Sequence, residues 1–343
     1  AFENGWVQPP QPVAERDEAV GIIGAGPAGL AAADMLREKG YQVTVYDRYD
    51  RVGGLLIYGI PGFKLEKHVV QRRHTLLEGG GVNFRLNCDI GTDISFGEIR
   101  EAHDAVLVAT GVYNARDISA PGVGMGGIVP ALDYLTASNR KSLDDEVADF
   151  DSGLLNAEGR DVVVIGGGDT AMDCVRTAIR QKANSVTCLY RRDRANMPGS
   201  QREVANAEEE GVDFRWLSAP QAFLGDNHVR AVQAQKIHLG QPDATGRQVP
   251  QIIENSSHEI PADLVIKALG FDPEDIPTMF GAPELEISKW GTIGVDWRTM
   301  MTNLPGVFAA GDIVRGASLV VWGVRDGRDA AESIHSYIKA QSE

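Results

Sequence analysis

The sequence predicts an α/β fold of two domains with parallel sheets, on three observations. The chain has 343 residues, more than one domain usually holds. A strand, a glycine-rich turn and a helix follow one another at residues 19–39, and a second copy of this pattern occupies residues 162–182. The first glycines of the two turns, Gly24 and Gly166, are 142 residues apart. A further strand follows each copy, at residues 43–46 and 186–190. Strands that alternate with helices in this way are typical of βαβ units.

The first copy has the pattern Gly-x-Gly-x-x-Gly between an apolar strand and an alanine-rich helix. Gly24 permits a tight turn, Gly26 allows a pyrophosphate to approach the backbone, and Gly29 allows the helix to pack closely on the strand. Asp47 ends the next strand and can accept hydrogen bonds from both hydroxyls of a ribose. We therefore expect a Rossmann-like domain that binds an adenine dinucleotide without a 2′-phosphate, such as FAD.

The second copy ends in Ala171, a variant of the same pattern. Its second strand leads into Arg191 and Arg192, where the first copy has Asp47. A carboxylate would repel a 2′-phosphate, whereas two guanidinium groups would bind it through charge-assisted, bidentate hydrogen bonds. We therefore expect this second Rossmann-like domain to bind NADPH. The sequence leaves open that Arg191, Arg192 and Arg194 form only a solvated basic surface.

Two dinucleotide sites in one chain suggest two redox cofactors in contact. Hydride transfer from a nicotinamide to a flavin needs no side-chain acid or base, because the protein supplies positioning and electrostatics. The sequence has no Ser/His/Asp arrangement that is evident and no metal-ligand spacing. We therefore expect neither a catalytic side chain nor a metal site.

The composition indicates which compartment the protein occupies and which classes of partner it does not bind. The formal net charge is −15, from 33 Lys and Arg against 48 Asp and Glu, which argues against nucleic acid or an anionic membrane as the main partner. Cys88, Cys174 and Cys188 lie far apart, so we expect no disulfide framework and a reducing, cytoplasmic compartment. The apolar run at residues 19–36 contains a proline, an aspartate and three glycines, which favours a strand, turn and helix over a membrane span.

Late in the chain, an apolar strand around residues 307–310 leads into Gly311 and Asp312, and a helix is expected from about residue 323 to 340. We predict that residues 19–122 and 280–343 form a discontinuous FAD-binding domain and that residues 123–279 form the NADPH-binding domain inserted into it. Residues 1–18 are expected to be a lead-in segment. The polar stretch at residues 139–160 is expected to be a surface excursion or linker.

The ordered motifs resemble the flavoproteins with two dinucleotide-binding domains, a group that includes thioredoxin reductase, adrenodoxin reductase and the glutamate synthase small subunit. The shared motifs are the first glycine turn with Asp47, Arg51-Val52-Gly53-Gly54-Leu55, Ala109-Thr110-Gly111, Gly166–Ala171, Ala268-Leu269-Gly270 and Ala310-Gly311-Asp312. Within the group the chain is most similar to the glutamate synthase small (beta) subunit, on Tyr58-Gly59-Ile60-Pro61, Lys64–Lys67, Met172-Asp173-Cys174, Tyr190-Arg191-Arg192, Met197-Pro198 and Ser318–Trp322.

This resemblance implies the site residues. The FAD contacts it implies are Gly24, Gly26, Pro27, Ala28, Gly29, Asp47, Arg48, Gly54, Leu55, Thr110, Gly111, Gly311, Asp312, Leu319 and Val320. The NADPH contacts it implies are Gly166, Gly167, Gly168, Asp169, Thr170, Arg191 and Arg192. Asp312 would bond the ribityl or pyrophosphate part of the flavin, and the amides near Leu319 and Val320 would face its pyrimidine end.

The resemblance also implies an activity and partners. Electrons would pass from NADPH to FAD, then to iron–sulfur centres, and finally to a large subunit that makes glutamate from glutamine and 2-oxoglutarate. Small subunits of this kind carry a cysteine-rich, cluster-binding N-terminal part that this chain does not contain, so we expect either a fragment or a separate iron–sulfur partner. The alternative is that the same FAD/NADPH module passes its electrons to another acceptor, such as ferredoxin or a pyrimidine-reducing domain. A single-site dinucleotide sensor and a flavin monooxygenase are further alternatives, whereas the distance between Cys174 and Cys188 argues against a disulfide reductase.

Overall fold

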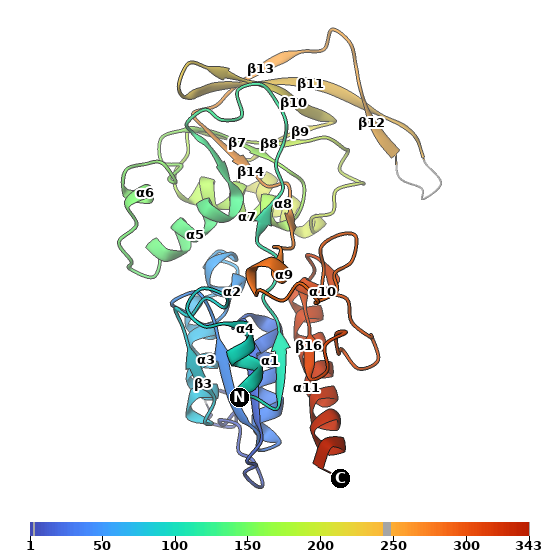
Figure 1. The fold of residues 1–343 in the computed structure, drawn as a ribbon. Coiled ribbons are helices and arrows are strands. Elements are labelled where there is room, and N and C mark those ends of the chain that lie inside the picture. The colour runs from blue at the N-terminus through green and yellow to red at the C-terminus, as the bar shows by residue number, and fades with distance from the viewer. Residues whose placement is uncertain (3, 243–247, 343) are drawn as a thin grey trace. The chain divides into compact units, whose positions relative to one another are not determined.

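Two parallel sheets form around the two glycine-rich turns. The computed structural model describes residues 1–2, 4–242 and 248–342 (Figure 1). The chain divides into unit 1, made of residues 1–58, 63–114 and 271–343, and unit 2, made of residues 59–62 and 115–270. The sequence led us to expect the changes of domain at 122/123 and 279/280; the units change at 114/115 and 270/271.

Unit 1 contains a five-stranded sheet in which every neighbouring pair of strands is parallel. The strand order is β16-β4-β1-β2-β3. The bounds are β1 Ala19–Ile23, β2 Gln42–Tyr46, β3 Asn83–Arg85, β4 Ala105–Val108 and β16 Val307–Ala309. The strand predicted at the start of residues 19–39 is confirmed as β1, and the strand predicted at 43–46 begins one residue earlier.

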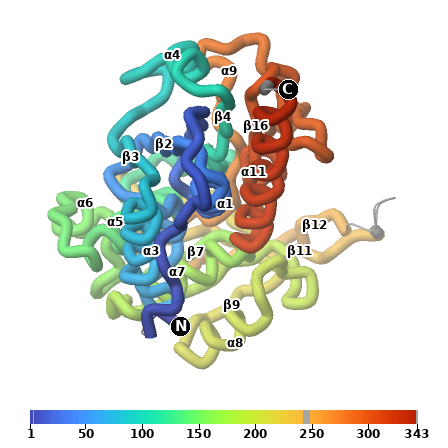
Figure 2. Tube along the Cα trace, turned by 90° about the horizontal axis from the view of Figure 1, so that it is seen from below, coloured from blue at the N-terminus to red at the C-terminus, as the bar shows by residue number. Residues whose placement is uncertain are grey.

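Helices cover both faces of this sheet (Figure 2). Their bounds are α1 Pro27–Glu38, α2 Leu55–Tyr58, α3 Lys67–Gly79, α4 Phe96–Glu101, α9 Ile276–Met279, α10 Asp312–Arg315 and α11 Val320–Ser342. The long α11 lies directly on α1, and a Cβ on Gly327 would be only 2.1 Å from the carbonyl oxygen of Ala28. The last helix of the chain therefore packs against the first at near backbone contact.

The lead-in segment is tied to unit 1, and its described residues, 1–2 and 4–18, form neither a helix nor a strand. Arg37, buried in α1, forms a bidentate ion pair with Glu15 and donates a further hydrogen bond to the carbonyl oxygen of Gly80. The amide of Arg16 donates to the carbonyl oxygen of Gly40 at 2.9 Å. These contacts hold residues 15–16 against the end of α1.

Unit 2 has a second five-stranded parallel sheet, in the order β6-β14-β7-β8-β9. Its strands are β6 Ile128–Pro130, β7 Asp161–Ile165, β8 Ser185–Tyr190, β9 Asp213–Trp216 and β14 Leu264–Lys267, and its helices are α5 Ala131–Lys141, α6 Ala148–Asp151, α7 Asp169–Arg180 and α8 Gln201–Glu209. The polar stretch at residues 139–160 holds the end of α5 and the short α6. The predicted α/β fold class with parallel sheets is confirmed.

An antiparallel sheet that the sequence analysis did not predict covers one face of the parallel sheet in unit 2. It consists of β10 Ser218–Gly225, β11 Val229–Pro242, β12 Gln248–Ile252 and β13 His258–Pro261. Phe223, Val232 and Ile260 pack against Val163 and Ile165 of the parallel strand β7. The short strands β5 (Asn114–Ala115) and β15 (Phe271–Asp272) lie where the chain passes between the units.

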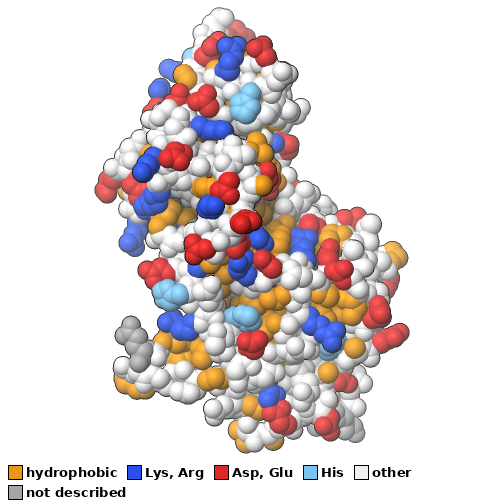
Figure 3. Space-filling view, turned by 90° about the vertical axis from the view of Figure 1, so that its left-hand side faces the viewer, with side chains coloured by type: hydrophobic (Ala, Val, Ile, Leu, Met, Phe, Trp, Pro, Cys, Tyr) orange, Lys and Arg blue, Asp and Glu red, His pale blue; other side chains and the backbone are white. Residues whose placement is uncertain are grey.

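Two further features of the structure are the length and apolarity of its helices and the distribution of its surface charges. None of the helices in the described part of the chain is both long and apolar enough to cross a lipid bilayer. On the face shown in Figure 3, acidic and basic side chains are interspersed.

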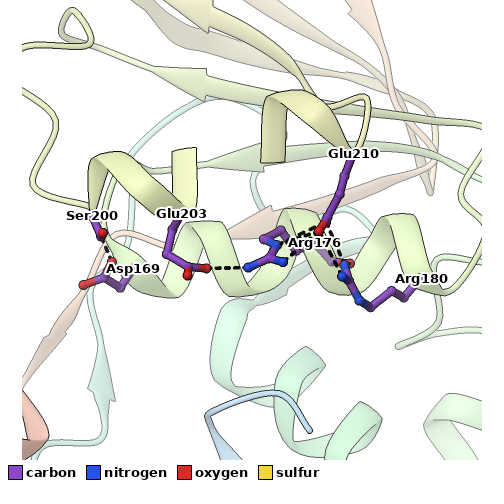
Figure 4. A network of polar contacts seen from close by, with 6 residues as sticks. All are labelled: Asp169, Arg176, Arg180, Ser200, Glu203 and Glu210. Carbon is purple, nitrogen blue, oxygen red and sulfur yellow. Dashed lines mark hydrogen bonds and ion pairs between the residues drawn. The ribbon is translucent and has the colours of Figure 1, made fainter. Parts of the chain in front are cut away.

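A charged network joins α8 to α7 in unit 2 (Figure 4). Arg176 on α7, whose side chain is only 10% exposed, bonds Glu203 at 2.6 Å and Glu210 at 2.7 Å. Arg180, one turn further along α7, also bonds Glu210 at 2.7 Å. The hydrogen bond from Arg180 lowers the pKa of Glu210 to about 2, against the opposing effect of burial and with further help from Arg176. Glu210 therefore stabilises the folded chain as a carboxylate.

We expect Glu210→Gln to lower the free energy of unfolding by about 1–2 kcal/mol at pH 7, since the side chain is partly exposed. The pKa of Glu210 is depressed from 4.5, so its contribution is complete above pH 4.5 and declines as the pH falls toward 2. Urea denaturation followed by circular dichroism at pH 7 and pH 4 measures this. Glu209→Gln, at the exposed neighbour, is the control. A difference between wild type and Glu210→Gln that is equal at both pH values would contradict the assignment.

Candidate nucleotide sites

The first glycine turn brings strand and helix to the closest approach that two backbones allow. Gly24 has φ +111°, and a Cβ there would lie 2.3 Å from the carbonyl oxygen of Ala109. A Cβ on Gly29 would lie 1.9 Å from the carbonyl oxygen of Gly24. Real Cβ atoms do not come so close, so the fold itself requires both glycines.

Gly26 is different, because the fold does not require a glycine there. Its φ of −79° and ψ of −174° suit any residue, and a Cβ would meet no atom within 4 Å. Gly26 is the N-cap of α1, and Pro27 follows as the first helical residue. The open space therefore lies over unpaired amides at a helix N-terminus, where anionic groups bind. A Cβ would fill part of this space.

Other predicted residues gather around this N-terminus. A Cβ on Gly54, just before Leu55 begins α2, would be 3.1 Å from the Cα atom of Gly26. A Cβ on Gly311, the N-cap of α10, would be 2.9 Å from the Cβ of Ala28. The structure thus brings together three segments that the sequence separates by up to 285 residues (Gly26 to Gly311).

The start of α11 belongs to the same region. A Cβ on Gly323 would lie 3.8 Å from the Cβ of Pro27. Leu319 and Val320 open the helix, with exposed fractions of 59% and 41%, and the first amides of a helix have no intrahelical acceptor. Asp312 accepts a hydrogen bond from the hydroxyl of Ser318 at 2.6 Å, and burial raises the pKa of its carboxyl group.

A hollow lies where β1, β2 and β4 end. Asp47 lines it, and its carboxylate accepts hydrogen bonds from the amides of Ala25 at 2.7 Å and Tyr49 at 2.9 Å. Burial raises the pKa of Asp47, and the two amides oppose that effect. A carboxylate has about four acceptor positions, so two are left for the hydroxyls of a ribose.

Side chains that the sequence analysis missed complete this hollow. Glu274 forms a bidentate ion pair with Arg48, with both N–O distances at 2.9 Å. The Arg48 guanidinium lies 5.3 Å from the centre of the Tyr49 ring and 4.9 Å from that of Tyr113. The hydroxyl of Thr110 is buried and has no hydrogen-bond partner among the described residues. A ligand that offers a polar group to Thr110 would fit here.

Gly111, the remaining predicted residue in this unit, follows directly. Its φ is +76°, and a Cβ would lie 3.3 Å from the ring of Tyr113. It therefore turns the chain after β4 so that Tyr113 reaches the hollow.

The glycine turn in unit 2 also contains one glycine that the fold requires and one that faces open space. Gly166 has φ +153°, and a Cβ there would be 2.2 Å from the carbonyl oxygen of Ala268. Gly168 has φ −90° and ψ 178°, and a Cβ would meet nothing within 4 Å. Between them, a Cβ on Gly167 would lie 2.3 Å from the ring of Tyr190. The open space again faces a helix N-terminus, here that of α7 at Asp169 and Thr170.

Residues 191–200, the arginine loop, are tied to this turn. The amide of Gly199 donates to the carbonyl oxygen of Gly167 at 2.9 Å, and the amide of Ser200 donates to the carboxylate of Asp169 at 3.0 Å. Asp169 therefore holds the loop in place, a role the sequence did not suggest.

The arginines of the loop differ in their partners. Arg194 pairs with Glu208 at 2.9 Å. Arg191 is exposed and Arg192 half-buried, and across the described residues neither side chain makes a hydrogen bond or an ion pair. Two cationic side chains thus remain free to bind an anion.

Comparisons with known proteins identify the family to which the chain belongs. A family model described as pyridine nucleotide-disulphide oxidoreductase matches residues 18–341, so both units fall within one oxidoreductase family. The glutamate synthase [NADPH] small chain of Azospirillum brasilense is 66% identical over 343 residues, which is all of this chain and 71% of that protein. The protein of the same name from Escherichia coli is 43% identical, over 99% of this chain and 72% of that protein. The chain belongs to the pyridine nucleotide-disulphide oxidoreductases and, within them, to the glutamate synthase [NADPH] small chains.

Solved structures share the fold at lower identity. FprA from Mycobacterium tuberculosis in complex with NADPH has a TM-score of 0.80 and 18% identity, covering 95% of this chain and 86% of that one. Thioredoxin reductase from Lactococcus lactis has a TM-score of 0.68 and 22% identity, covering 94% of this chain and all of that one. The resemblance predicted from the sequence, and the assignment to the oxidoreductases, are confirmed.

The glycines that face open space and those that the fold requires should respond differently to substitution by alanine. We expect Gly26→Ala and Gly168→Ala to change the free energy of unfolding by no more than about 1 kcal/mol, because the backbone accepts alanine. Gly26→Ala should nevertheless weaken FAD binding by about tenfold, and Gly168→Ala should raise the KM for NADPH similarly, because the Cβ occupies the space over the helix N-terminus. Flavin content, steady-state kinetics and thermal unfolding measure these effects.

Gly24→Ala is the contrasting variant. It should cost about 3 kcal/mol or more of stability, since the Cβ overlaps the backbone of Ala109. If Gly26→Ala retains full flavin and full stability, the pyrophosphate does not pass over this turn.

Proposed function

We propose that this chain is the flavin-containing, NADPH-oxidising module of a glutamate synthase. FAD binds at the turn of unit 1 and NADPH binds at the turn of unit 2. When bound, FAD accepts a hydride from NADPH and passes the electrons onward. The chain provides binding and orientation, and no side-chain acid or base is needed.

We base this proposal on the contrast between the charged groups at the two turns. A buried carboxylate, Asp47, stands at the end of β2, and its two remaining acceptor positions suit ribose hydroxyls. After β8, Arg191 and Arg192 stand without anionic partners among the described residues. A 2′-phosphate carries about −1.5 to −2 charges, so it is repelled at the first position and attracted at the second.

The cysteines argue against a disulfide reductase, although thioredoxin reductases share the fold. Cys174 and Cys188 are fully buried, and burial raises the pKa of both thiols, that of Cys188 to about 12. Thiol–disulfide exchange requires an accessible thiolate. Cys88 is the third cysteine of the chain and is free. A redox-active pair is therefore not formed by these thiols.

The partners follow from the same proposal. The relatives named glutamate synthase small chain are longer than this chain, which spans 71–72% of the two compared above. We propose that electrons leave through iron–sulfur centres, on a separate partner or on another part of the subunit, and reach a large subunit in the cytoplasm. Transfer to a different acceptor, such as ferredoxin or a pyrimidine-reducing domain, is the alternative.

The free arginines generate a prediction about coenzyme choice. The double variant Arg191→Ala/Arg192→Ala should raise the KM for NADPH by about tenfold or more and leave the KM for NADH nearly unchanged, because each charged hydrogen bond is worth about 1.5–3 kcal/mol. Steady-state reduction of an artificial dye with each coenzyme measures this.

Arg194→Ala is the matched control. Arg194 lies on the same loop but already pairs with Glu208, so its removal should change neither KM strongly. Equal responses of NADPH and NADH to the double variant would show that these arginines do not bind the 2′-phosphate.

The modular function has its own test. The purified chain should be yellow, its visible absorption should bleach on anaerobic addition of NADPH, and it should reduce a dye without forming glutamate by itself. Absorption spectroscopy and a glutamate assay with and without the large subunit measure this. A colourless protein would favour a single-site dinucleotide sensor, and glutamate formation by this chain alone would refute the modular assignment.

A further inference from the structure

The two units place an arginine at the same position of their repeated βαβ frames. In unit 1, Ile23 pairs with Tyr46, and in unit 2, Ile165 pairs with Leu189. The residue two positions after Tyr46 is Arg48, and the residue two positions after Leu189 is Arg191. By strand register, Arg48 is thus the structural counterpart of Arg191, the side chain proposed to bind a 2′-phosphate.

What differs is the partner of each arginine. Both terminal nitrogens of Arg48 are engaged by the carboxylate of Glu274 at 2.9 Å, whereas Arg191 is exposed and free of ion pairs among the described residues. Glu274 and Arg48 are mostly buried, with side-chain exposures of 23% and 27%, and both line the hollow beside Asp47. Glu274 therefore occupies the donors that a phosphate would need.

We propose that Glu274 determines the specificity of the first nucleotide site, by holding Arg48 in an ion pair that prevents it from binding a 2′-phosphate. This inference rests on the proposed function, in which unit 1 holds FAD and unit 2 holds NADPH. Glu274 keeps the coenzyme that the enzyme consumes out of the site that its flavin occupies. The residue touches Arg48 and acts through it.

Charge counting supports this role. The charged side chains that line the hollow are Asp47, Arg48, Asp89 and Glu274, with a net charge of −2, so a phosphate that enters it meets a negative environment. If Glu274 were neutral, that charge would fall to −1, and one guanidinium nitrogen of Arg48 would be released to donate to a phosphate oxygen. Tyr49 and Tyr113 would still hold the guanidinium at the hollow, because both rings lie within 6 Å of it.

The test is competition with FAD for the flavin-free full chain, because a ligand bound only in unit 2 does not compete. Quenching of flavin fluorescence reports rebinding, with 5′-AMP and adenosine 2′,5′-bisphosphate as competitors. In the wild type, 5′-AMP should compete at least about tenfold better than the bisphosphate. In Glu274→Gln the two should compete about equally, a change of about tenfold in their ratio.

Two further variants separate specificity from general effects. Asp89→Asn removes a negative charge from the same hollow without releasing Arg48, and it should leave the ratio unchanged. Glu274→Asp keeps the charge and should restore discrimination against the bisphosphate. A ratio that is unaltered in Glu274→Gln, or altered equally in Asp89→Asn, would overturn the inference.

The outcomes also distinguish this inference from the proposed function. If FAD fails to rebind to wild-type chain that was purified with flavin, the comparison moves to the flavin-loaded protein. There, Glu274→Gln should release more flavin at equilibrium into excess NADP⁺ than into excess NAD⁺, and equal release would refute the inference. A chain that never contains or binds FAD refutes the proposed function instead.

Discussion

The structure depends on two places where a glycine turn comes into backbone contact with the residue that follows a neighbouring strand. At Gly24 and at Gly166, a Cβ would lie 2.3 and 2.2 Å from a carbonyl oxygen of the neighbouring strand connection. Each turn can therefore form only with glycine, and it directs the amides of the following helix at the edge of a parallel sheet. Everything that surrounds a turn, from the acidic or basic side chain after the second strand to the loop that closes over it, is positioned relative to this contact.

The two units show how one frame accommodates two ligands by changing only the side chains around it. The glycines that face open space, Gly26 and Gly168, have the same backbone conformation in both units. The charged groups beyond β2 and β8 differ, and in unit 1 an acidic side chain from a distant segment engages the arginine that the frame supplies. In the function proposed above, selectivity therefore resides in the partners of the arginines more than in their presence.

Local patterns in the sequence were sufficient for the repeated βαβ units. Strand, turn and helix are adjacent in the chain, so the expected bounds differ from those observed by only a residue or two, as at β7, which begins at Asp161 where Val162 was expected. Glu274 could not be found in this way, because it lies 226 residues from Arg48 and no local pattern links them. The antiparallel sheet β10–β13 was also missed, because its strands follow one another with no helix between them and so lack the pattern of strand, glycine turn and helix. Apolar residues that alternate with polar ones, Val232 with Ala234 and Ile237 with Leu239, would have been the signal.

The insertion of unit 2 into unit 1 imposes an order on folding during synthesis. Residues 115–270 are continuous apart from a four-residue piece, so unit 2 can complete its sheet as soon as that stretch has left the ribosome. Unit 1 cannot, because β4 waits for β16 and α1 waits for α11, both from the last forty residues. Until residues 307–342 have left the ribosome, the apolar faces of β4 and α1 remain without their partners. The nascent chain thus carries an unfinished unit 1 alongside a finished unit 2, and α11 is the helix that completes the packing of unit 1.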